Sequence, residues 1–412
     1  MVEKPMIKIY DACCGSGKTT RLIDDISKLP MEQKVIIVVP LLSETHRYAG
    51  TIEDPIDPLS LTNLDYDKNH PLYLRFFQHP LAKNKEGSKL VGLDSLIENG
   101  SNVVTTHALF KNLTPTLLSK IQEQNYLLVI DEVLTTYEEY VDLKKEAKQL
   151  LDDGIIYLEE DGLTLRWNEK YKGLERYQQE INMCNNGALL LIDKKVVLWE
   201  MAKQVLESFS TVWMATYLFE GSYMCGYLHY NDFKFTVEKF GKSGKEFKNL
   251  IHIIDDPKLN EIGDKNNALS KNFQMKQTDL MKKVKNNIYN VFHNKFPTTN
   301  TNQRLWTCYK VAQTSLSGKG YTTCFLPLGT KATNDYIEAK VLVFIANLFT
   351  NPSVDKLLFK KGIKVVEELY ALGEMVQWIY RSQIRRGDPI VIYIPSKRMR
   401  DILIGWVDGK YD

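Results

Sequence analysis

The sequence lacks several features that would assign it to a specialised class of protein. Its six cysteines form no Cys-x-x-Cys pair, and two of them, Cys13 and Cys14, are adjacent. This usage favours reduced thiols in a cytosolic compartment over a disulfide framework or a zinc site. The seven histidines are scattered singly, without metal-ligand spacing. The chain also has no internal repeat and no low-complexity tract.

Long apolar runs and a strong charge of one sign are missing as well. No run approaches the roughly 18 residues that a membrane span requires, and the N-terminus has no signal-peptide pattern. We therefore expect a cytoplasmic protein with no membrane partner. With 53 basic and 51 acidic residues the net charge is only +2, so a nucleic-acid site would have to be a local patch.

The length and composition are those of an ordinary globular protein with more than one domain. A chain of 412 residues exceeds the usual size of a single hydrophobic core, so two or three domains are expected. Its content of 44% hydrophobic and 25% charged residues is typical of folded soluble domains.

The most informative stretch is residues 11–20, which follow the apolar run 7–10 and precede helical sequence. A strand, a glycine-containing loop and a helix in this order are the layout of a P-loop. The glycines allow backbone N–H groups to point inward at phosphate, Lys18 adds a charge for the β- and γ-phosphates, and the Thr19 hydroxyl serves Mg²⁺. The residues expected to bind the nucleotide are Gly15, Ser16, Gly17, Lys18, Thr19 and Thr20.

Three apolar runs, 35–40, 102–107 and 126–130, are each followed by helical sequence, and this alternation predicts an α/β fold with a parallel sheet. Asp131 and Glu132 follow the third run directly. We expect Asp131 to hold Mg²⁺ opposite Thr19, and Glu132 to orient or deprotonate the attacking water. The alternative is that both acids merely end a strand with solvated charge. The predicted cofactors are ATP and Mg²⁺.

The rest of the chain divides by pattern. Residues 135–209 are predicted to be a small α+β accessory insertion, with a hairpin from 155–158 and 163–167, and 211–217 returns to buried-strand character. The first domain is placed at 1–222, a boundary region at 223–248 and a second α/β domain at 249–412. In that domain strands are predicted near 249–254, 304–308, 322–326 and 390–394, with helices at about 268–292, 335–349, 363–381 and 396–406. The lysines of the helix around 271–285 are expected to form a solvated face rather than a track for phosphates.

A second signature lies near the C-terminus. On a continuous helix Gln377, Arg381 and Arg385 would recur at i, i+4 and i+8 and share one face. Arginine suits a triphosphate because its planar fork pairs phosphate oxygens and stays charged. We therefore expect Gln377, Arg381 and Arg385 to act with Glu132 in catalysis, without a choice between the two arginines. The alternative is a pair of surface arginines that pack on acidic neighbours.

These blocks resemble the motifs of superfamily 2 helicases of the DEAD/DEAH type. Ala12-x-x-Gly-x-Gly-Lys-Thr19 resembles motif I, and residues 377–387 resemble motif VI, Gln-x-x-Gly-Arg-x-x-Arg, except that Tyr380 replaces the glycine and the second arginine comes one residue late. Further resemblances follow in helicase order: 35–42 to motif Ia, 104–107 to the later strand-contacting motif of the first domain, 211–217 to motif III, and 329–335 to motif V. The amino-acid sequences of 331–336, 377–387 and 393–400 resemble those of a group of phage-encoded helicases.

The resemblance implies two RecA-like lobes that hydrolyse ATP at their interface, with the small α+β insertion in the first lobe. It implies a helicase or translocase acting on nucleic acid, single-stranded DNA rather than RNA, in a bacterial host's cytoplasm, with replication or recombination proteins as further partners. Strand contacts would come from hydroxyls and backbone amides. The residues expected to make them are Pro40, Ser43, Thr105, Thr106, Thr307 and Thr333. Trp306 or Trp378 would either stack on a base or lie in a core.

Two other functions remain open at this point. The chain could be a nucleotide-switched P-loop ATPase that binds or remodels protein partners without separating strands. A packaging motor is a third possibility, although no acidic nuclease cluster follows the ATPase sequence.

Overall fold

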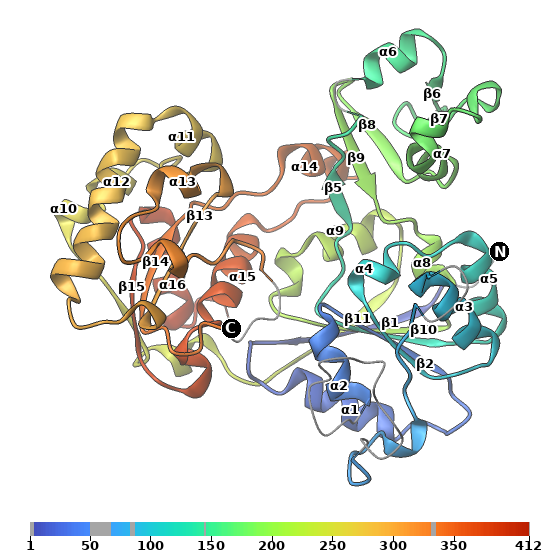
Figure 1. Cartoon of the computed structure of the whole chain (residues 1–412), viewed down its shortest axis with the longest axis horizontal. Coiled ribbons are helices and arrows are strands. Elements are labelled where there is room, and N and C mark those ends of the chain that lie inside the picture. The colour runs from blue at the N-terminus through green and yellow to red at the C-terminus, as the bar shows by residue number, and fades with distance from the viewer. Residues whose placement is uncertain (1–3, 50–66, 83–86, 144–145, 331–334, 412) are drawn as a thin grey trace. The chain divides into compact units, whose positions relative to one another are not determined.

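The computed structural model describes residues 4–49, 67–82, 87–143, 146–330 and 335–411. Its contacts separate into two compact units, neither of which is one continuous stretch of chain. The first comprises Met1–Asp11, Thr19–Glu238 and Asn351–Val365, and the second comprises Ala12–Lys18, Lys239–Thr350 and Val366–Asp412. Each unit contains a parallel β-sheet accompanied by helices, so the predicted α/β class is confirmed (Figure 1).

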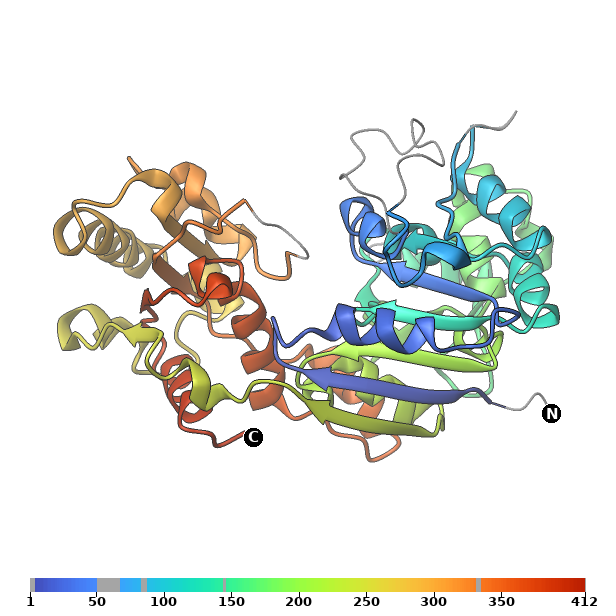
Figure 2. The ribbon, with the colours of Figure 1, turned by 90° about the horizontal axis from the view of Figure 1, so that it is seen from below.

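A six-stranded sheet forms the centre of the first unit. In spatial order its strands are β11 (Phe235–Phe240), β1 (Met6–Ala12), β10 (Thr211–Thr216), β4 (Leu127–Asp131), β2 (Val35–Val39) and β3 (Val103–Thr106). The five strands from β1 to β3 in this order pair in parallel, and Figure 2 shows their arrows side by side. Every residue of β2 and β4 is buried, as their uninterrupted apolar sequence predicts for strands covered on both faces.

The helices of the first unit begin where the sequence offers caps. Thr114 accepts a hydrogen bond from Leu117 N, and Pro115 then opens α5, where its missing N–H has no cost. Ser88 caps α3 in the same way through Leu90 N. The helices are α1 (Lys18–Ser27), α2 (Thr45–Ala49), α3 (Lys89–Glu98), α4 (His107–Phe110), α5 (Pro115–Glu123), α8 (Gln204–Glu207), α9 (Tyr223–Tyr230) and α14 (Pro352–Phe359).

The accessory insertion is a small α+β element of the first unit. The predicted hairpin is confirmed as β6 (Ile156–Leu158) paired with β7 (Leu165–Trp167). The element also contains a three-stranded antiparallel sheet, whose strands precede and follow the hairpin in the sequence, and two helices. Its remaining parts are β5 (Tyr137–Glu139), β8 (Leu189–Ile192), β9 (Val196–Glu200), α6 (Ala147–Asp152) and α7 (Gln178–Asn185).

The second unit is organised around a four-stranded parallel sheet. Its order is β12 (Ile251–Ile253), β15 (Ile390–Tyr393), β14 (Val341–Ile345) and β13 (Arg304–Cys308). The predictions of strands near 249–254, 304–308 and 390–394 are confirmed.

Two predictions in this unit are wrong. The helix predicted at 335–349 is replaced by β14, because the run from Val341 to Ile345 is apolar on every side and all five residues are buried between β13 and β15. The strand predicted at 322–326 is a 3₁₀ turn, Thr322–Cys324, followed by a single bridge between Phe325 and Trp306.

The helix predicted at 268–292 is present as two helices, since Gln277 leaves helical geometry with a ψ of 62°. The helices of the second unit are α10 (Pro257–Asn260), α11 (Lys271–Lys276), α12 (Thr278–Asn290), α13 (Gln313–Leu316), α15 (Glu367–Ile379) and α16 (Lys397–Val407). A π-helical turn, Val291–Lys295, extends α12.

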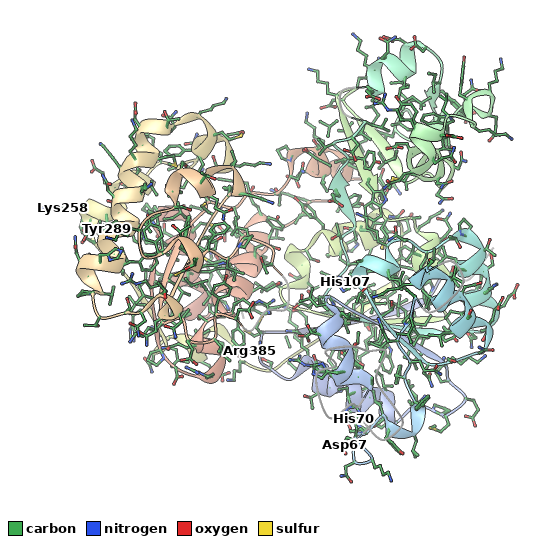
Figure 3. The ribbon with its side chains drawn as sticks, viewed as in Figure 1. Asp67, His70, His107, Lys258, Tyr289 and Arg385 are labelled. Atoms are coloured by element: carbon green, nitrogen blue, oxygen red, sulfur yellow. The ribbon has the colours of Figure 1, made fainter. Side chains whose placement is uncertain are left out.

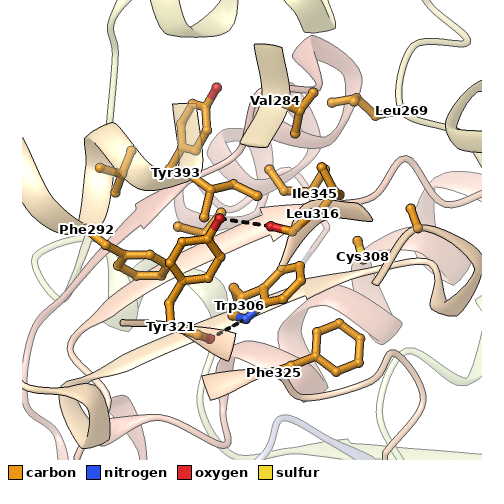
Figure 4. Close-up of a cluster of buried hydrophobic side chains, with 14 of the residues drawn as sticks. Leu269, Val284, Phe292, Trp306, Cys308, Leu316, Tyr321, Phe325, Ile345 and Tyr393 are labelled. Atoms are coloured by element: carbon orange, nitrogen blue, oxygen red, sulfur yellow. Dashed lines mark hydrogen bonds between the residues drawn. The ribbon is translucent and has the colours of Figure 1, made fainter. Parts of the chain in front are cut away.

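The core of the second unit contains Trp306, and this decides between two predictions for that residue. Its side chain is fully buried, and its indole N–H donates to Tyr321 O at 2.8 Å. The Tyr321 ring meets it edge-on at 5.6 Å, and the Tyr321 hydroxyl donates to Leu316 O (Figure 4). Trp378 is buried too, with its indole N–H donated to Leu326 O. Both tryptophans are therefore core residues and not base-stacking platforms.

Candidate active site

The glycine loop between β1 and α1 has the backbone conformation that its sequence predicts. Gly15 and Gly17 have φ angles of +71° and +79°, a region that side-chain-bearing residues rarely adopt. Within the loop Ser16 N donates to Cys13 O at 3.2 Å. The Lys18 ammonium donates to Ala12 O at 2.6 Å and to Cys13 O at 3.2 Å, so the loop's own carbonyl oxygens hold the lysine over it.

The first turn of α1 is joined to the end of β4 by a hydrogen bond. The Thr19 hydroxyl donates to Asp131 Oδ2 at 2.9 Å, across 112 residues of sequence. Asp131 is only 7% exposed, and it is the last residue of its strand. Because a hydroxyl that donates its hydrogen keeps lone pairs on its oxygen, Thr19 can serve a cation while it remains bonded to Asp131.

A third residue, which sequence reasoning missed, completes this cluster. Tyr48 of α2 donates its hydroxyl to the same oxygen, Asp131 Oδ2, at 2.8 Å, and its side chain is fully buried. Burial first, and then the negative charge of Asp131, raise the pKa of Tyr48 well above its ordinary value. No sequence motif could have identified this tyrosine, because its contact with Asp131 spans 83 residues and depends on the fold.

The donor set of the cluster suits Mg²⁺. A carboxylate and a hydroxyl are hard oxygen ligands, and Mg²⁺ is usually held by one or two protein groups together with phosphate oxygens and water. Among the residues that the structure describes, no group of three or more His, Cys, Asp or Glu side chains could hold a metal by itself. None of the six cysteines, all of which lie within the described residues, forms a disulfide bond.

Glu132, the carboxylate predicted to orient or deprotonate the attacking water, has an unusual backbone conformation. Its φ is +66°, a left-handed conformation that costs a residue with a side chain about 1–2 kcal/mol. It follows Asp131 directly and is partly buried. Strain of this kind persists where the surrounding structure holds the residue in place, and it is concentrated at functional sites.

The end of β10 lies between the two strands that bear the predicted site. Thr216 is in register with Asp11 of β1, and Ala215 is in register with Asp131 of β4. The stretch compared with motif III thus ends at the same edge of the sheet as the acidic strand.

The predicted helical stripe of Gln377, Arg381 and Arg385 is wrong. The helix α15 ends at Ile379, and only Gln377 belongs to it. Buried Ser382 turns its hydroxyl back to Ile379 O at 2.6 Å, and Gln383 N donates to Ala339 O, so the chain leaves helical geometry. Arg381 lies in the intervening turn and Arg385 in the 3₁₀ turn Gln383–Arg386, where Figure 3 labels it. Both arginines are partly buried.

The predicted nucleic-acid contacts fall into two groups. Pro40 follows Val39, which is in register with Thr106 of β3, so Pro40 and Thr106 end neighbouring strands. Ser43 is exposed in the 3₁₀ turn Leu42–Glu44, and the Thr106 hydroxyl accepts from Leu109 N as the cap of α4, whose first residue His107 is labelled in Figure 3. These three residues are accessible or partly accessible.

Two of the other predicted contacts, Thr105 and Thr307, do not reach the surface. Thr105 and Thr307 have fully buried side chains whose hydroxyl oxygens have no hydrogen-bond partner within the described residues. A nucleic-acid strand could not contact these two hydroxyls in this conformation, so neither residue belongs to the proposed interface. Thr333 lies outside the described residues.

The expectation about membranes is tested only for helices. Within the described ranges, the structure contains no helix of the length and apolarity needed to cross a bilayer.

The chain is similar to one described protein over nearly its whole length. It is 32% identical to the SPbeta prophage-derived uncharacterized protein YonV of Bacillus subtilis (strain 168) over 431 aligned positions, which cover 98% of this chain and 99% of the relative. A family model described as the YonV C-terminal Rossmann-like domain matches residues 245–407. Neither description mentions a helicase, so that resemblance stays a prediction.

Proposed function

Because the chain belongs to the family of the prophage protein YonV, whose description states no activity, we propose its function from its own residues: an ATP-dependent nucleic-acid helicase or translocase, directed at DNA. The observation that carries this proposal is the hydrogen bond from Thr19 to Asp131. It joins the residue after the loop lysine to an acid at the carboxyl end of a buried parallel strand. That pairing of a hydroxyl and a carboxylate is what a magnesium-bound triphosphate requires.

In the proposed reaction the loop binds the phosphates of ATP through its backbone N–H groups, and Lys18 leaves its carbonyl partners to neutralise the β- and γ-phosphate oxygens. Thr19 and Asp131 would hold Mg²⁺, which would supply positive charge to the phosphate oxygens. Glu132 orients the attacking water and takes its proton. Arg381 or Arg385 neutralises charge that develops on the γ-phosphate.

The finer part of the proposal is a pair of RecA-like lobes. It is supported by two separate parallel sheets and by the position of β10, which places one parallel strand between the loop strand β1 and the acidic strand β4. A Rossmann-like C-terminal domain is compatible with a second lobe of this kind.

The choice of DNA and of a bacterial host cytoplasm is supported by the prophage origin of the relative. Replication and recombination proteins of the same host are the partners we propose. The proposed contacts with the DNA strand are Pro40 and Thr106, at the ends of two adjacent β-strands of the first sheet, and Ser43 in the 3₁₀ turn that follows Pro40. Contacts of this type hold phosphates and are independent of base sequence.

The test is ATP hydrolysis by the full chain with no nucleic acid, with single-stranded DNA and with single-stranded RNA. We expect Mg²⁺-dependent turnover that DNA stimulates, and stimulation that decreases with salt as phosphate contacts are screened. Glu132→Gln is the matched control, because it should bind ATP but lose about a hundredfold in turnover.

A turnover rate indifferent to both nucleic acids would contradict the helicase proposal. It would favour the nucleotide-switched ATPase, especially if a non-hydrolysable ATP analogue were enough to make the protein bind or remodel its protein partners. Displacement of a strand from tailed DNA and RNA duplexes then separates a helicase from a translocase that opens no duplex.

A further inference from the structure

The Asp131 carboxylate is held from two sides by elements that are distant in sequence. Thr19 approaches from α1 and Tyr48 from α2, and both hydroxyls donate to the same oxygen, Oδ2, at 2.9 Å and 2.8 Å. Two donors on one oxygen fix the rotation of the carboxylate plane. They leave Oδ1 outside both of these hydrogen bonds.

The tyrosine itself is held firmly. Its side chain is fully buried, and the segment before it is folded on itself, since the Thr45 hydroxyl donates to Leu42 O at 2.7 Å and Arg47 pairs with Glu44 at 2.9 Å. A phenol so enclosed has few rotamers available to it. Tyr48 therefore offers Asp131 a hydrogen-bond donor whose position is restricted by the surrounding packing.

We propose that Tyr48 is a positioning residue for the magnesium ion, which it serves by holding Asp131 in the orientation that the ion requires. This inference rests on the proposed function, because it assumes that Asp131 serves the Mg²⁺ of bound ATP. Removal of a group that orients a metal-ligating carboxylate lowers metal affinity or activity by about 10- to 100-fold. Tyr48 acts through Asp131 and contacts neither the nucleotide nor the ion.

The experiment measures binding and not turnover. The dissociation constant of a fluorescent, non-hydrolysable ATP analogue is determined for the full chain with saturating Mg²⁺ and again with EDTA, and the ratio of the two constants is the gain due to metal. For Tyr48→Phe we expect the constant in EDTA to stay within about twofold of wild type, while the gain due to Mg²⁺ decreases by about tenfold or more. The Mg²⁺ concentration for half-maximal hydrolysis should rise by a similar factor.

Tyr126→Phe is the matched control. Tyr126 is a fully buried tyrosine that directly precedes β4, at the opposite end of that strand from Asp131, and its hydroxyl donates to Ser101 O at 2.8 Å. Its removal deletes the same atom from the same unit without touching Asp131. The gain due to Mg²⁺ should therefore match that of wild type.

A double variant keeps the test decisive if Tyr48→Phe loses thermal stability. In an Asp131→Asn background the carboxylate that Tyr48 positions is gone, so the addition of Tyr48→Phe should change the gain due to Mg²⁺ no further. An additional loss there would overturn the inference.

The inference is also overturned if Tyr48→Phe keeps the wild-type gain, or if it weakens binding equally in Mg²⁺ and EDTA, because the tyrosine would then act on the fold or on the nucleotide. If wild type fails to bind the analogue under both conditions, the proposed function fails first, and the role of Tyr48 fails with it.

Discussion

Both units of this protein contain a parallel sheet accompanied by helices, but the two sheets differ in the side chains at their carboxyl ends. In the first unit β1 leads into the glycine loop, and β4 ends in Asp131 and is followed by Glu132. In the second unit β13 ends at Cys308 and β14 at Ile345. Apolar or thiol side chains thus occupy positions that correspond, in the first sheet, to the start of the glycine loop after β1 and to the acid at the end of β4.

This difference teaches that a shared α/β layout does not carry a shared activity, since function depends on the side chains placed at the strand ends. We infer that the first sheet provides nucleotide chemistry, and that the second contributes at most its arginines. The predictions below test that division of labour.

The largest effect is expected from Lys18→Ala. Loss of the ammonium should abolish ATP binding and turnover, because the remaining loop amides cannot neutralise a triphosphate alone. Lys283→Ala, which removes an exposed lysine from α12 of the second unit, is the control and should leave both unchanged. Isothermal titration calorimetry with ATP measures the difference. If Lys18→Ala still bound ATP tightly, the inference that the glycine loop after β1 binds the nucleotide would be contradicted.

The next effect concerns the arginines of the second unit. Arg381→Ala or Arg385→Ala should lower turnover by about a thousandfold, with ATP affinity spared, because an arginine that stabilises the transition state adds little to ground-state binding. The neighbouring Arg386, which is bound to Glu338, provides the control Arg386→Ala, for which no change is expected. Steady-state kinetics beside equilibrium binding separates the two quantities. If all three variants resemble wild type, the second unit contributes no arginine.

A smaller effect concerns stability in the first unit. Burial raises the pKa of Glu200 in β9 to about 7, and the hydrogen bond from Asn231 only partly opposes this. The folded protein therefore keeps a proton that the unfolded chain loses near pH 4.5, so stability decreases as the pH rises from about 4.5 to 7 and stays lower above that. The full difference amounts to at most about 3 kcal/mol.

Glu200→Gln should remove this dependence. The variant is expected to melt at a higher temperature than wild type at pH 8, and at the same temperature at pH 4.5. Glu123→Gln, at an exposed site on α5, should melt at the wild-type temperature at both pH values. Calorimetry at several pH values measures it, and a melting difference that does not vary with pH would rule out Glu200 as the titrating group.

The smallest effect compares one buried threonine from each sheet. Thr105→Val and Thr307→Val each remove a buried hydroxyl that has no hydrogen-bond partner within the described residues, so each should stabilise the fold by about 1 kcal/mol. Thr106→Val, which removes the cap of α4, should instead destabilise it by about 1 kcal/mol. Urea denaturation measures all three. Weaker DNA binding by the first two variants would restore them to the strand interface.

Much of the first sheet and its site could be predicted from the sequence, because local patterns decide them. The loop glycines, the apolar runs and the acid after β4 are each recognisable within about ten residues of chain. Tyr48 and the end of α15 could not be predicted in this way. One depends on a contact across 83 residues, and the other on Ser382 and Gln383 bonding to groups outside a helical ladder.

The second sheet was predicted less well for a related reason. The run that forms β14 is apolar on all sides, and such a run fits a buried helix or a buried strand equally until its neighbours are known. The burial of Thr105 and Thr307 could not be predicted, because a short polar side chain near the end of a strand gives no sign in the sequence of whether it is exposed.

The placement of α14 has a consequence for anyone who divides this protein into fragments. Although its residues lie within the stretch matched by the C-terminal family model, Asn351–Val365 belongs to the first unit. Leu358 approaches α9 so closely that a methyl group on Gly226 would meet it at 2.7 Å, and Lys356 pairs with Asp193. A gene truncated after Glu238 would encode a product with an uncovered apolar surface on α9, prone to aggregate until a separately expressed C-terminal piece supplied the missing helix by complementation.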